Sequence, residues 1–314
     1  MNDLAGLGAA LRGRGLTARA LAAWAVPRVS ALPRVVPALP RADTPAGALL
    51  ELFVAGRELP LQAVPLLDDL SRADLIDVAG NHVRARVAIV PLGDALLVCD
   101  RLDAPADREL VCWPDDSSYH LALALPRGPH AAWLDLGCGS AFAPLLRPAV
   151  AHAIRGTDLN PRAVRYARLG AALSGISHLR AYEGDLGEGL PLAQRHANLV
   201  TCNAPIPGLD ADPYRPMWLA GASDFVARLV DEMRGQILRD GTVVVHAAYD
   251  ALAPVIRELP GERVVVTYTP PGVRPFCVAW WRPDAPARHV EVTRELTRER
   301  PHVTYADYQA IAND

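Results

Sequence analysis

The stretch at residues 133–146, WLDLGCGSAFAPLL, constrains the fold of this chain more than any other. An apolar run up to Leu136 stops at Gly137 and Gly139, and an apolar pattern then resumes, which predicts a strand, a tight turn and a helix. Glycine lets the backbone approach a ligand without a side chain in between, and the free N–H groups of the helix start point at that ligand. The stretch therefore predicts a site for a nucleotide-like cofactor.

Two cofactors of this kind compete for the turn. A dinucleotide-binding turn reads G-x-G-x-x-G/A, but counting from Gly137 the sixth residue here is Phe142. Asp135 lies just before the turn, where it would repel a pyrophosphate but attract the sulfonium and ammonium groups of S-adenosylmethionine (SAM). The turn therefore favours SAM over NAD, and an ordinary glycine-containing turn of some other α/β domain is the alternative.

Strand-like and helix-like segments alternate from this stretch onward. Helical patterns include residues 161–173 and 223–239. Seven segments have the length and apolar content of strands: residues 132–136, 153–157, 179–183, 197–202, 241–247, 262–268 and 276–281. The alternation predicts an α/β domain with a doubly wound, mostly parallel sheet of seven strands.

The spacing Asp135-x-Gly137-x-Gly139-x-Ala141 resembles the first motif of the class I SAM-dependent methyltransferases, with Ala141 in place of the usual third glycine. The seven expected strands are similar to the sheet of that superfamily, whose last strand runs antiparallel. The resemblance covers residues 115–282. It implies an enzyme that binds SAM, with Asp135, Gly137 and Gly139 in the cofactor site.

Two further acids fall at the ends of expected strands. Asp158 ends the second strand, 158 − 137 = 21 residues after Gly137, where a carboxylate can bind the ribose hydroxyls, and Leu159 follows it in the cofactor site. The resemblance implies that Asp185 binds the adenine amino group and that Leu186 contributes its backbone N–H; a turn-forming role is the alternative for Asp185. Because the carboxyl ends of parallel strands lie along one edge, we expect these residues in one site.

The fourth expected strand ends in Asn203-Ala204-Pro205-Ile206. This resembles the Asn-Pro-Pro-Tyr/Phe motif of amino-methylating members of the superfamily, in which the asparagine accepts a hydrogen bond from the target nitrogen and the aromatic residue stacks on a planar group. Asn203 keeps the amide and is a candidate for both the catalytic and the cofactor site. Ile206 cannot stack, so a flat amide or nucleobase is disfavoured as the methyl acceptor. The alternative role for Asn203 is a turn former before Pro205.

Two more residues are candidates for the chemistry. Tyr214 lies in the polar and aromatic loop after this motif, and its ring face can attract a sulfonium or a developing positive charge, as can that of Trp218. His120 precedes the first strand and is a candidate general base. The alternatives are that Tyr214 only covers the core and that His120 is a polar residue at a surface or helix start.

The first 110 residues are expected to form a smaller unit of their own. Helical patterns are followed by a proline-rich stretch up to Pro40, and Thr44 and Pro45 then begin a further helix. Residues 82–91 and 94–99 alternate like the two strands of a hairpin. We therefore expect a helical arm and a winged-helix-like α+β module in residues 1–110, ahead of a SAM-binding catalytic domain in residues 111–314.

This N-terminal unit could bind DNA or act as a lid over a small-molecule site. Arg84 and Arg86 alternate on one strand face, but acids surround them in the sequence, including Asp74 and Asp77, and the net charge of the chain is −3. Both observations disfavour a phosphate-binding surface. We therefore expect a lid and no nucleic-acid partner.

Composition limits the location and the other ligands. The 5 cysteines are scattered and none forms a C-x-x-C pair, which indicates reduced thiols in a cytoplasm and predicts no metal site. Arginine and proline interrupt every long apolar run, so we expect neither a signal sequence nor a membrane partner. All 32 basic residues are arginines, as is typical of a GC-rich genome.

Three functions fit these observations. The leading hypothesis is a SAM-dependent methyltransferase acting on an amine or hydroxyl of a small molecule, with Asn203 orienting the nucleophile. The second is a SAM-dependent cyclase, in which the α-amine of SAM attacks its own γ-carbon to give azetidine-2-carboxylate and methylthioadenosine. The third is a SAM- or DNA-binding regulator built on the winged-helix-like module, which salt-sensitive DNA binding without turnover would reveal.

Overall fold

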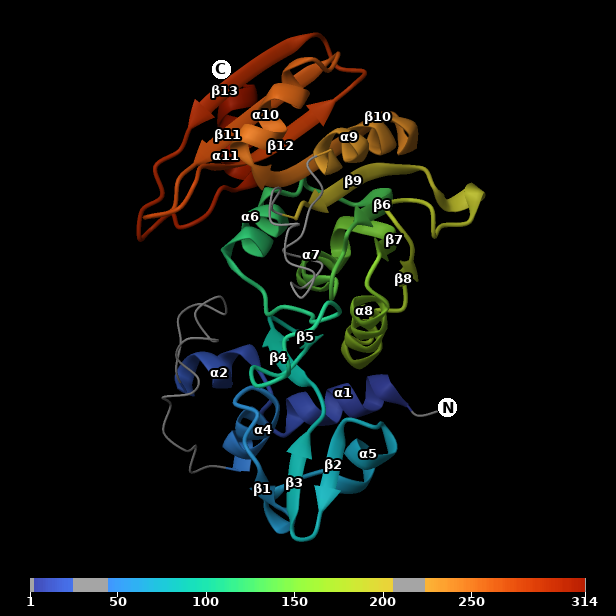
Figure 1. Ribbon diagram of the computed structural model, residues 1–314, viewed down its shortest axis with the longest axis vertical. Helices are drawn as coiled ribbons and strands as arrows, with labels where there is room; N and C mark the ends of the chain where they lie inside the picture. The colour runs from blue at the N-terminus through green and yellow to red at the C-terminus, as the bar shows by residue number, and fades with distance from the viewer. Residues whose placement is uncertain (1–2, 25–44, 206–223, 314) are drawn as a thin grey trace.

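The computed structural model describes residues 3–24, 45–205 and 224–313, and one large sheet dominates it (Figure 1). The sheet has eight strands in the order β13-β11-β12-β10-β9-β6-β7-β8. The strands are β6 (His130–Leu136), β7 (Ala151–Asp158), β8 (Leu179–Glu183), β9 (Ala197–Asn203), β10 (Ile237–Ala248), β11 (Glu262–Tyr268), β12 (Phe276–Arg282) and β13 (Arg288–Thr293).

All seven strands that the sequence predicts are present in this sheet. β6, β7, β8, β9 and β10 pair in parallel, whereas β12 runs antiparallel to both of its neighbours, β10 and β11. This order, with one antiparallel strand near an edge, is the class I methyltransferase-like arrangement, so the predicted fold class is confirmed. The number of strands needs a correction, because β13 pairs in parallel with β11 and satisfies backbone groups that an edge strand would leave unpaired.

Alternate residues of the strands supply two cores, one on each face of the sheet. Trp133 and Val244 belong to one core, whereas their neighbours Leu134 and Val243 belong to the other. Helices cover both faces. Of the helices in residues 111–313, four have residues in the first core: α6 (Asp116–Ala124), α7 (Phe142–Leu146), α8 (Pro161–Ser174) and α11 (Tyr305–Ala312). The second core contains residues of α9 (Phe225–Gln236) and α10 (Tyr249–Arg257).

The start of α8 is fixed by its sequence. The Asn160 side chain accepts a hydrogen bond from the backbone N–H of Arg162 at 2.9 Å, and Pro161 occupies the first turn, where its missing N–H costs nothing. Gly175, with φ at +71°, ends the helix in the left-handed conformation. α8 therefore begins directly after the end of β7, where Asp158 lies. Asp158 belongs to the site described below.

The N-terminal unit contains two small sheets. Their strands are β1 (Leu59–Pro60), β2 (Ile76–Ala79) and β3 (His82–Ala85), in the order β1-β3-β2, and the separate pair β4 (Ala88–Leu92) and β5 (Ala95–Cys99). The helices of this unit are α1 (Leu4–Gly13), α2 (Ala18–Trp24), α4 (Pro45–Phe53) and α5 (Leu67–Arg72), and it has a short 3-10 turn, η3 (Leu61–Ala63). Two further 3-10 turns, η4 (Pro148–Val150) and η5 (Leu192–Gln194), connect elements of the large sheet. The boundary at residues 110 and 111 stays a prediction.

The expected hairpin is only partly correct. β4 and β5 do pair across the turn at Gly93, but residues 82–85 belong to the other small sheet and not to the same strand as β4. The regular strand is interrupted at Arg86, between β3 and β4. The backbone N–H of Arg86 donates to the Leu75 carbonyl, and its side chain pairs with Asp74 and Asp77. These contacts hold Arg86 against the turn before β2, which separates the two strands.

The N-terminal unit packs against α8, on the side of that helix away from the sheet (Figure 1). The backbones of α1 and α8 approach so closely that a Cβ atom at Gly8 would lie 1.7 Å from the Leu173 carbonyl oxygen. The Arg12 side chain donates to the same carbonyl at 3.2 Å. As a result, one continuous hydrophobic core extends from Leu7 in α1 to Tyr308 in α11.

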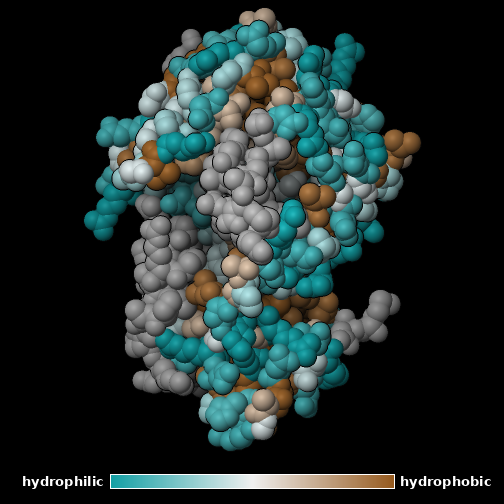
Figure 2. Space-filling view, in the orientation of Figure 1, coloured by the Kyte–Doolittle hydropathy of each residue, from teal (hydrophilic) through white to brown (hydrophobic). Residues whose placement is uncertain are grey.

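On the face shown in Figure 2, hydrophobic residues of the N-terminal unit lie in small groups among hydrophilic ones. Among the helices of the described ranges, none combines the length and the apolar character needed to cross a membrane.

The close approach at Gly8 gives a prediction about stability. Gly8→Ala should lower the free energy of unfolding by about 1–3 kcal/mol, because the added methyl forces α1 away from α8. Gly13→Ala is the matched control in the same helix, since a Cβ there meets nothing within 4 Å, and it should leave stability unchanged or raise it by up to about 1 kcal/mol. Urea unfolding measures both; equal effects would show that α1 does not dock as described.

Candidate active site

A pocket of about 1870 Å³ opens at the carboxyl ends of the parallel strands. Its volume exceeds that of a typical small-ligand site, so it has room for a cofactor and a second molecule. All the described candidate catalytic and cofactor-binding residues line this one pocket: His120, Asp135, Gly137, Gly139, Asp158, Leu159, Asp185, Leu186 and Asn203. Tyr214, Trp218 and Ile206 lie outside the described residues.

The turn between β6 and α7 has the conformation that its glycines suggest. Gly137 and Gly139 adopt φ values of +64° and +55°, and a Cβ at Gly139 would meet nothing within 4 Å, so this residue borders open space. Ala141, in place of the third glycine, keeps the left-handed conformation with φ at +63°. That conformation costs an ordinary residue about 1–2 kcal/mol, so the turn is maintained here despite the side chain.

Asp158 is tied to this turn by its carboxylate. One oxygen accepts the backbone N–H of Gly139 at 2.8 Å, and the other accepts the backbone N–H of Asn160 at 2.8 Å. Burial raises the pKa of Asp158, and these two hydrogen bonds oppose the shift. The carboxylate therefore connects the ends of β6 and β7 and still has lone pairs for hydroxyl groups of a ligand.

Asp135 is the more deeply buried acid, with 3% of its surface exposed. Burial raises the pKa of Asp135 to about 7. The Thr201 hydroxyl donates a hydrogen bond to this carboxylate at 2.5 Å, which lowers the pKa and so opposes part of the shift. The Thr201 oxygen in turn accepts the indole N–H of Trp133 at 2.7 Å, so its own proton is directed to Asp135. A buried carboxylate of this kind is stabilised by a positively charged ligand.

At the third strand, Asp185 forms an ion pair with Arg228 of α9, and Leu186 adopts a φ of +48° beside it. Both residues line the pocket. Their contact with the adenine ring, which the resemblance implies, stays a prediction. The residues present therefore fit SAM: Asp135 toward its positive groups, Asp158 toward the ribose hydroxyls, and Asp185 with Leu186 toward the adenine.

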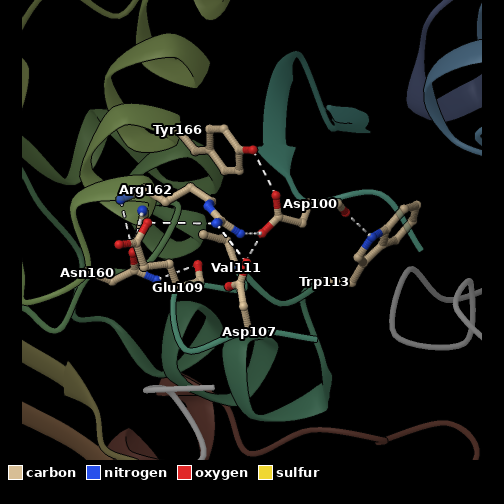
Figure 3. A network of polar contacts seen from close by, with 9 residues as sticks. Asp100, Asp107, Glu109, Val111, Trp113, Asn160, Arg162 and Tyr166 are labelled. Carbon is tan, nitrogen blue, oxygen red and sulfur yellow. Dashed lines mark hydrogen bonds and ion pairs between the residues drawn. The ribbon is translucent and has the colours of Figure 1, made fainter. Parts of the chain in front are cut away.

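The segment before α6 forms another wall of the pocket through Arg108, Cys112 and Asp115. A buried carboxylate at the end of β5, Asp100, holds this segment: it accepts the Val111 N–H at 2.7 Å, the Tyr166 hydroxyl at 2.8 Å and the Arg162 guanidinium at 3.1 Å (Figure 3).

Asn160 adds a second tie to the same segment, because its amide nitrogen donates to the Glu109 carbonyl at 2.8 Å. Asn160 thus does more than cap α8, which is the role its sequence position indicates. Among the described residues, none before Arg108 lines the pocket, so the N-terminal unit reaches the site through the segment that Asp100 holds. Its role as a lid stays a prediction.

The pocket wall next to Asn203 contains two polar residues that sequence reasoning missed, His246 and Tyr268. The Asn203 amide nitrogen donates to the Ser117 hydroxyl oxygen at 2.8 Å, and its oxygen lies 2.8 Å from His246 Nδ1. His246 Nε2 lies 2.6 Å from the Tyr268 hydroxyl. The sequence contains one signal for these contacts, because His246 is a histidine inside the apolar run of β10. The sheet register places it directly beside Asn203.

His120 is buried, with 1% of its surface exposed, and stacks on Tyr268 at a ring-centroid distance of 4.0 Å. Its Nδ1 accepts the backbone N–H of Val303 at 2.8 Å. Burial lowers the pKa of His120 to about 3, with His246 and His302 adding to the shift. A histidine with so low a pKa is a poor general base at neutral pH, so the geometry does not favour the expected role of His120.

No family model matches the chain. Among curated proteins it is similar to an uncharacterized RNA methyltransferase, pc0248, of Protochlamydia amoebophila, with 28% identity over 120 residues, 37% of this chain and 27% of the relative. The match thus spans little more than a quarter of that relative.

Solved structures with partial similarity include a tRNA m1G37 methyltransferase of M. jannaschii (TM-score 0.44, 13% identity, 63% of this chain and 57% of that one). Another is a ribosomal protein L11 methylase of Lactobacillus delbrueckii subsp. bulgaricus (TM-score 0.39, 17% identity, 53% of this chain and 77% of that one).

The strand order, with the glycines and acids at the strand ends, is the arrangement of the class I SAM-dependent methyltransferase fold. The predicted enzyme class, a SAM-dependent transferase, and the predicted cofactor, SAM, agree with this fold and with the name of the partial relative.

The raised pKa of Asp135 gives a prediction about cofactor binding. Below about pH 7 this carboxyl is protonated in the free protein and no longer attracts a cation, so SAM affinity should fall roughly tenfold or more between pH 7.5 and 5.5. In Asp135→Asn the affinity should be weaker at pH 7.5 and should lose most of this pH dependence. Calorimetric titration at several pH values measures both proteins, and an equal slope for the two would contradict the assignment.

Proposed function

We propose that the protein transfers the methyl group of SAM to an amine nitrogen of a small molecule, as a member of the branch that carries Asn-Pro-Pro-Tyr/Phe-like motifs. The observation that carries this proposal is the weak basicity of the groups around Asn203. Transfer to a hydroxyl requires a base that removes its proton, whereas a neutral amine already offers a lone pair. An amine is therefore the acceptor that this pocket suits best.

The described groups that face Asn203 support this argument. His120 has a pKa of about 3, and burial also lowers the pKa of His246. Asp115 already accepts hydrogen bonds from the Ser117 hydroxyl, the Ser118 N–H and the Ser118 hydroxyl. These groups are poorly suited to remove a proton from an alcohol.

Each described residue has a plain role in this proposal. When bound, SAM supplies an electrophilic methyl group on a sulfonium. Asn203 accepts an N–H of the acceptor and orients its nitrogen, while Tyr268 and Phe276, whose ring centroids lie 6.2 Å apart, offer an aromatic wall to its apolar part. Asp115 and Asp116 give this side of the pocket a negative character that attracts an amine.

RNA is the competing acceptor, because the partial relative is named an RNA methyltransferase. Binding to RNA depends on arginine side chains that are free to contact phosphates. Arg84 of the N-terminal unit instead pairs with Asp103 at 2.5 Å, and Arg86 pairs with Asp74 and Asp77. These pairs disfavour a phosphate-binding surface around Arg84 and Arg86, and with it the DNA-binding regulator.

The product formed from SAM tests the proposal. Purified protein is incubated with SAM alone, with a set of small primary and secondary amines, with the matching alcohols, and with total RNA, and the products are identified by mass spectrometry. We expect S-adenosylhomocysteine and an N-methylated product only with an amine, and no turnover by Asp158→Ala, which loses hydrogen bonds to the ribose. Methylthioadenosine formed from SAM alone would indicate the cyclase, and methylated RNA would indicate the other acceptor; either result would contradict the proposal.

A further inference from the structure

Five side chains form a continuous line of hydrogen bonds along one wall of the pocket. The line runs from Asp115, the N-cap of α6, through Ser117 in α6, Asn203 at the end of β9 and His246 in β10 to Tyr268 at the end of β11. The successive distances are 2.5, 2.8, 2.8 and 2.6 Å. All five residues also line the pocket. We call this line the Asp115–Tyr268 relay.

The carboxylate of Asp115 sets the direction of the first two hydrogen bonds. An ionised carboxylate can only accept, so the single hydroxyl proton of Ser117 is donated to Asp115. The Ser117 oxygen can then only accept from its other neighbour, which must be the NH₂ group of Asn203. The Asn203 amide is thereby oriented with its nitrogen toward Ser117 and its oxygen toward His246.

The same reasoning fixes the next two hydrogen bonds. Because the Asn203 oxygen can only accept, His246 must carry its proton on Nδ1. Burial keeps this imidazole neutral by lowering its pKa, so Nε2 has no proton and accepts the hydroxyl of Tyr268. His246 is 2% exposed and stacks on Phe276 at a centroid distance of 5.6 Å, so the ring has little freedom to turn over.

The orientation of the amide decides which nucleophile Asn203 can assist. With the oxygen fixed by His246, the second lone pair of that oxygen is available to an N–H of the acceptor. The acceptor nitrogen then keeps its own lone pair for the methyl group. A flipped amide would instead donate an N–H to that lone pair and block the attack.

We propose that the Asp115–Tyr268 relay locks the Asn203 amide with its oxygen toward an N–H of the acceptor amine, with His246 as a positioning residue that acts through Asn203. This inference rests on the proposed function. It extends that function by assigning positioning roles to Ser117, His246 and Tyr268.

Two substitutions at His246 distinguish the roles of its two ring nitrogens, Nδ1 and Nε2. Asparagine places an amide nitrogen near the position of Nδ1 and so keeps the donor to Asn203, whereas glutamine places one near the position of Nε2 and loses that donor. We expect His246→Gln to lower kcat roughly 10- to 100-fold and His246→Asn to lower it by less than about fivefold. SAM affinity should change by less than about twofold in both variants, because His246 is assigned no contact with the cofactor.

The other side of the amide offers a second matched pair. Ser117→Ala removes the group that accepts from the Asn203 nitrogen, and it should lower kcat roughly tenfold. Ser117→Thr retains a hydroxyl and should recover most of the lost rate. Equal rates for His246→Asn and His246→Gln, in variants whose circular dichroism shows a native fold, would overturn the inference while leaving the proposed function intact.

The tautomer of His246 tests the relay without any turnover. ¹⁵N NMR of histidine-labelled protein at neutral pH should show His246 as the neutral Nδ1–H form, with its signals assigned by their loss in His246→Asn. The Nε2–H form or an imidazolium would overturn the relay. If the wild-type protein methylates no amine, the proposed function fails, and the tautomer still decides whether the amide is oriented as inferred.

Discussion

Parallel strands end on the same edge of a sheet, and in this protein that constraint brings Asp135, Asp158 and Asn203 to one pocket. β6 lies between β7 and β9, so the turn after β6 is flanked by the ends of both neighbours. The hydrogen bond from the Gly139 N–H to Asp158 is the direct result of this arrangement. Burying the carboxylates of Asp135 and Asp158 at this edge costs free energy, and a cationic cofactor can offset that cost. The fold and the cofactor therefore depend on the same geometry.

The parts of the site that the sequence predicts are those set by short-range order. The turn glycines follow their strand directly, and Asp158 follows Gly137 by the length of one intervening helix and strand. Even the departure at Ala141 changes little, because the turn imposes the left-handed conformation on an alanine. Spacing along the chain was therefore enough to find the acids and glycines of the pocket.

The relay and the Asp100 network could not be predicted, because their members are far apart in the sequence. Ser117 and Asn203 are separated by 86 residues, and Asp100 and Arg162 by 62, so only the packed structure brings them together. The hairpin prediction failed at Arg86 for a related reason, since its contacts with Asp74 and Leu75 override the alternating pattern. Likewise, β13 joins the sheet because β11 offers it a free edge, which the pattern of β13 alone does not reveal.

Hydrogen–deuterium exchange with and without SAM tests the central claim most directly, namely that SAM binds at the carboxyl edge of β6 and β7. The account predicts slower exchange on SAM addition in peptides that cover residues 137–141, 158–160 and 184–186, because a ligand there shields and orders these backbone N–H groups. Unchanged exchange in these three segments at saturating SAM, or protection only in the N-terminal unit, would contradict it.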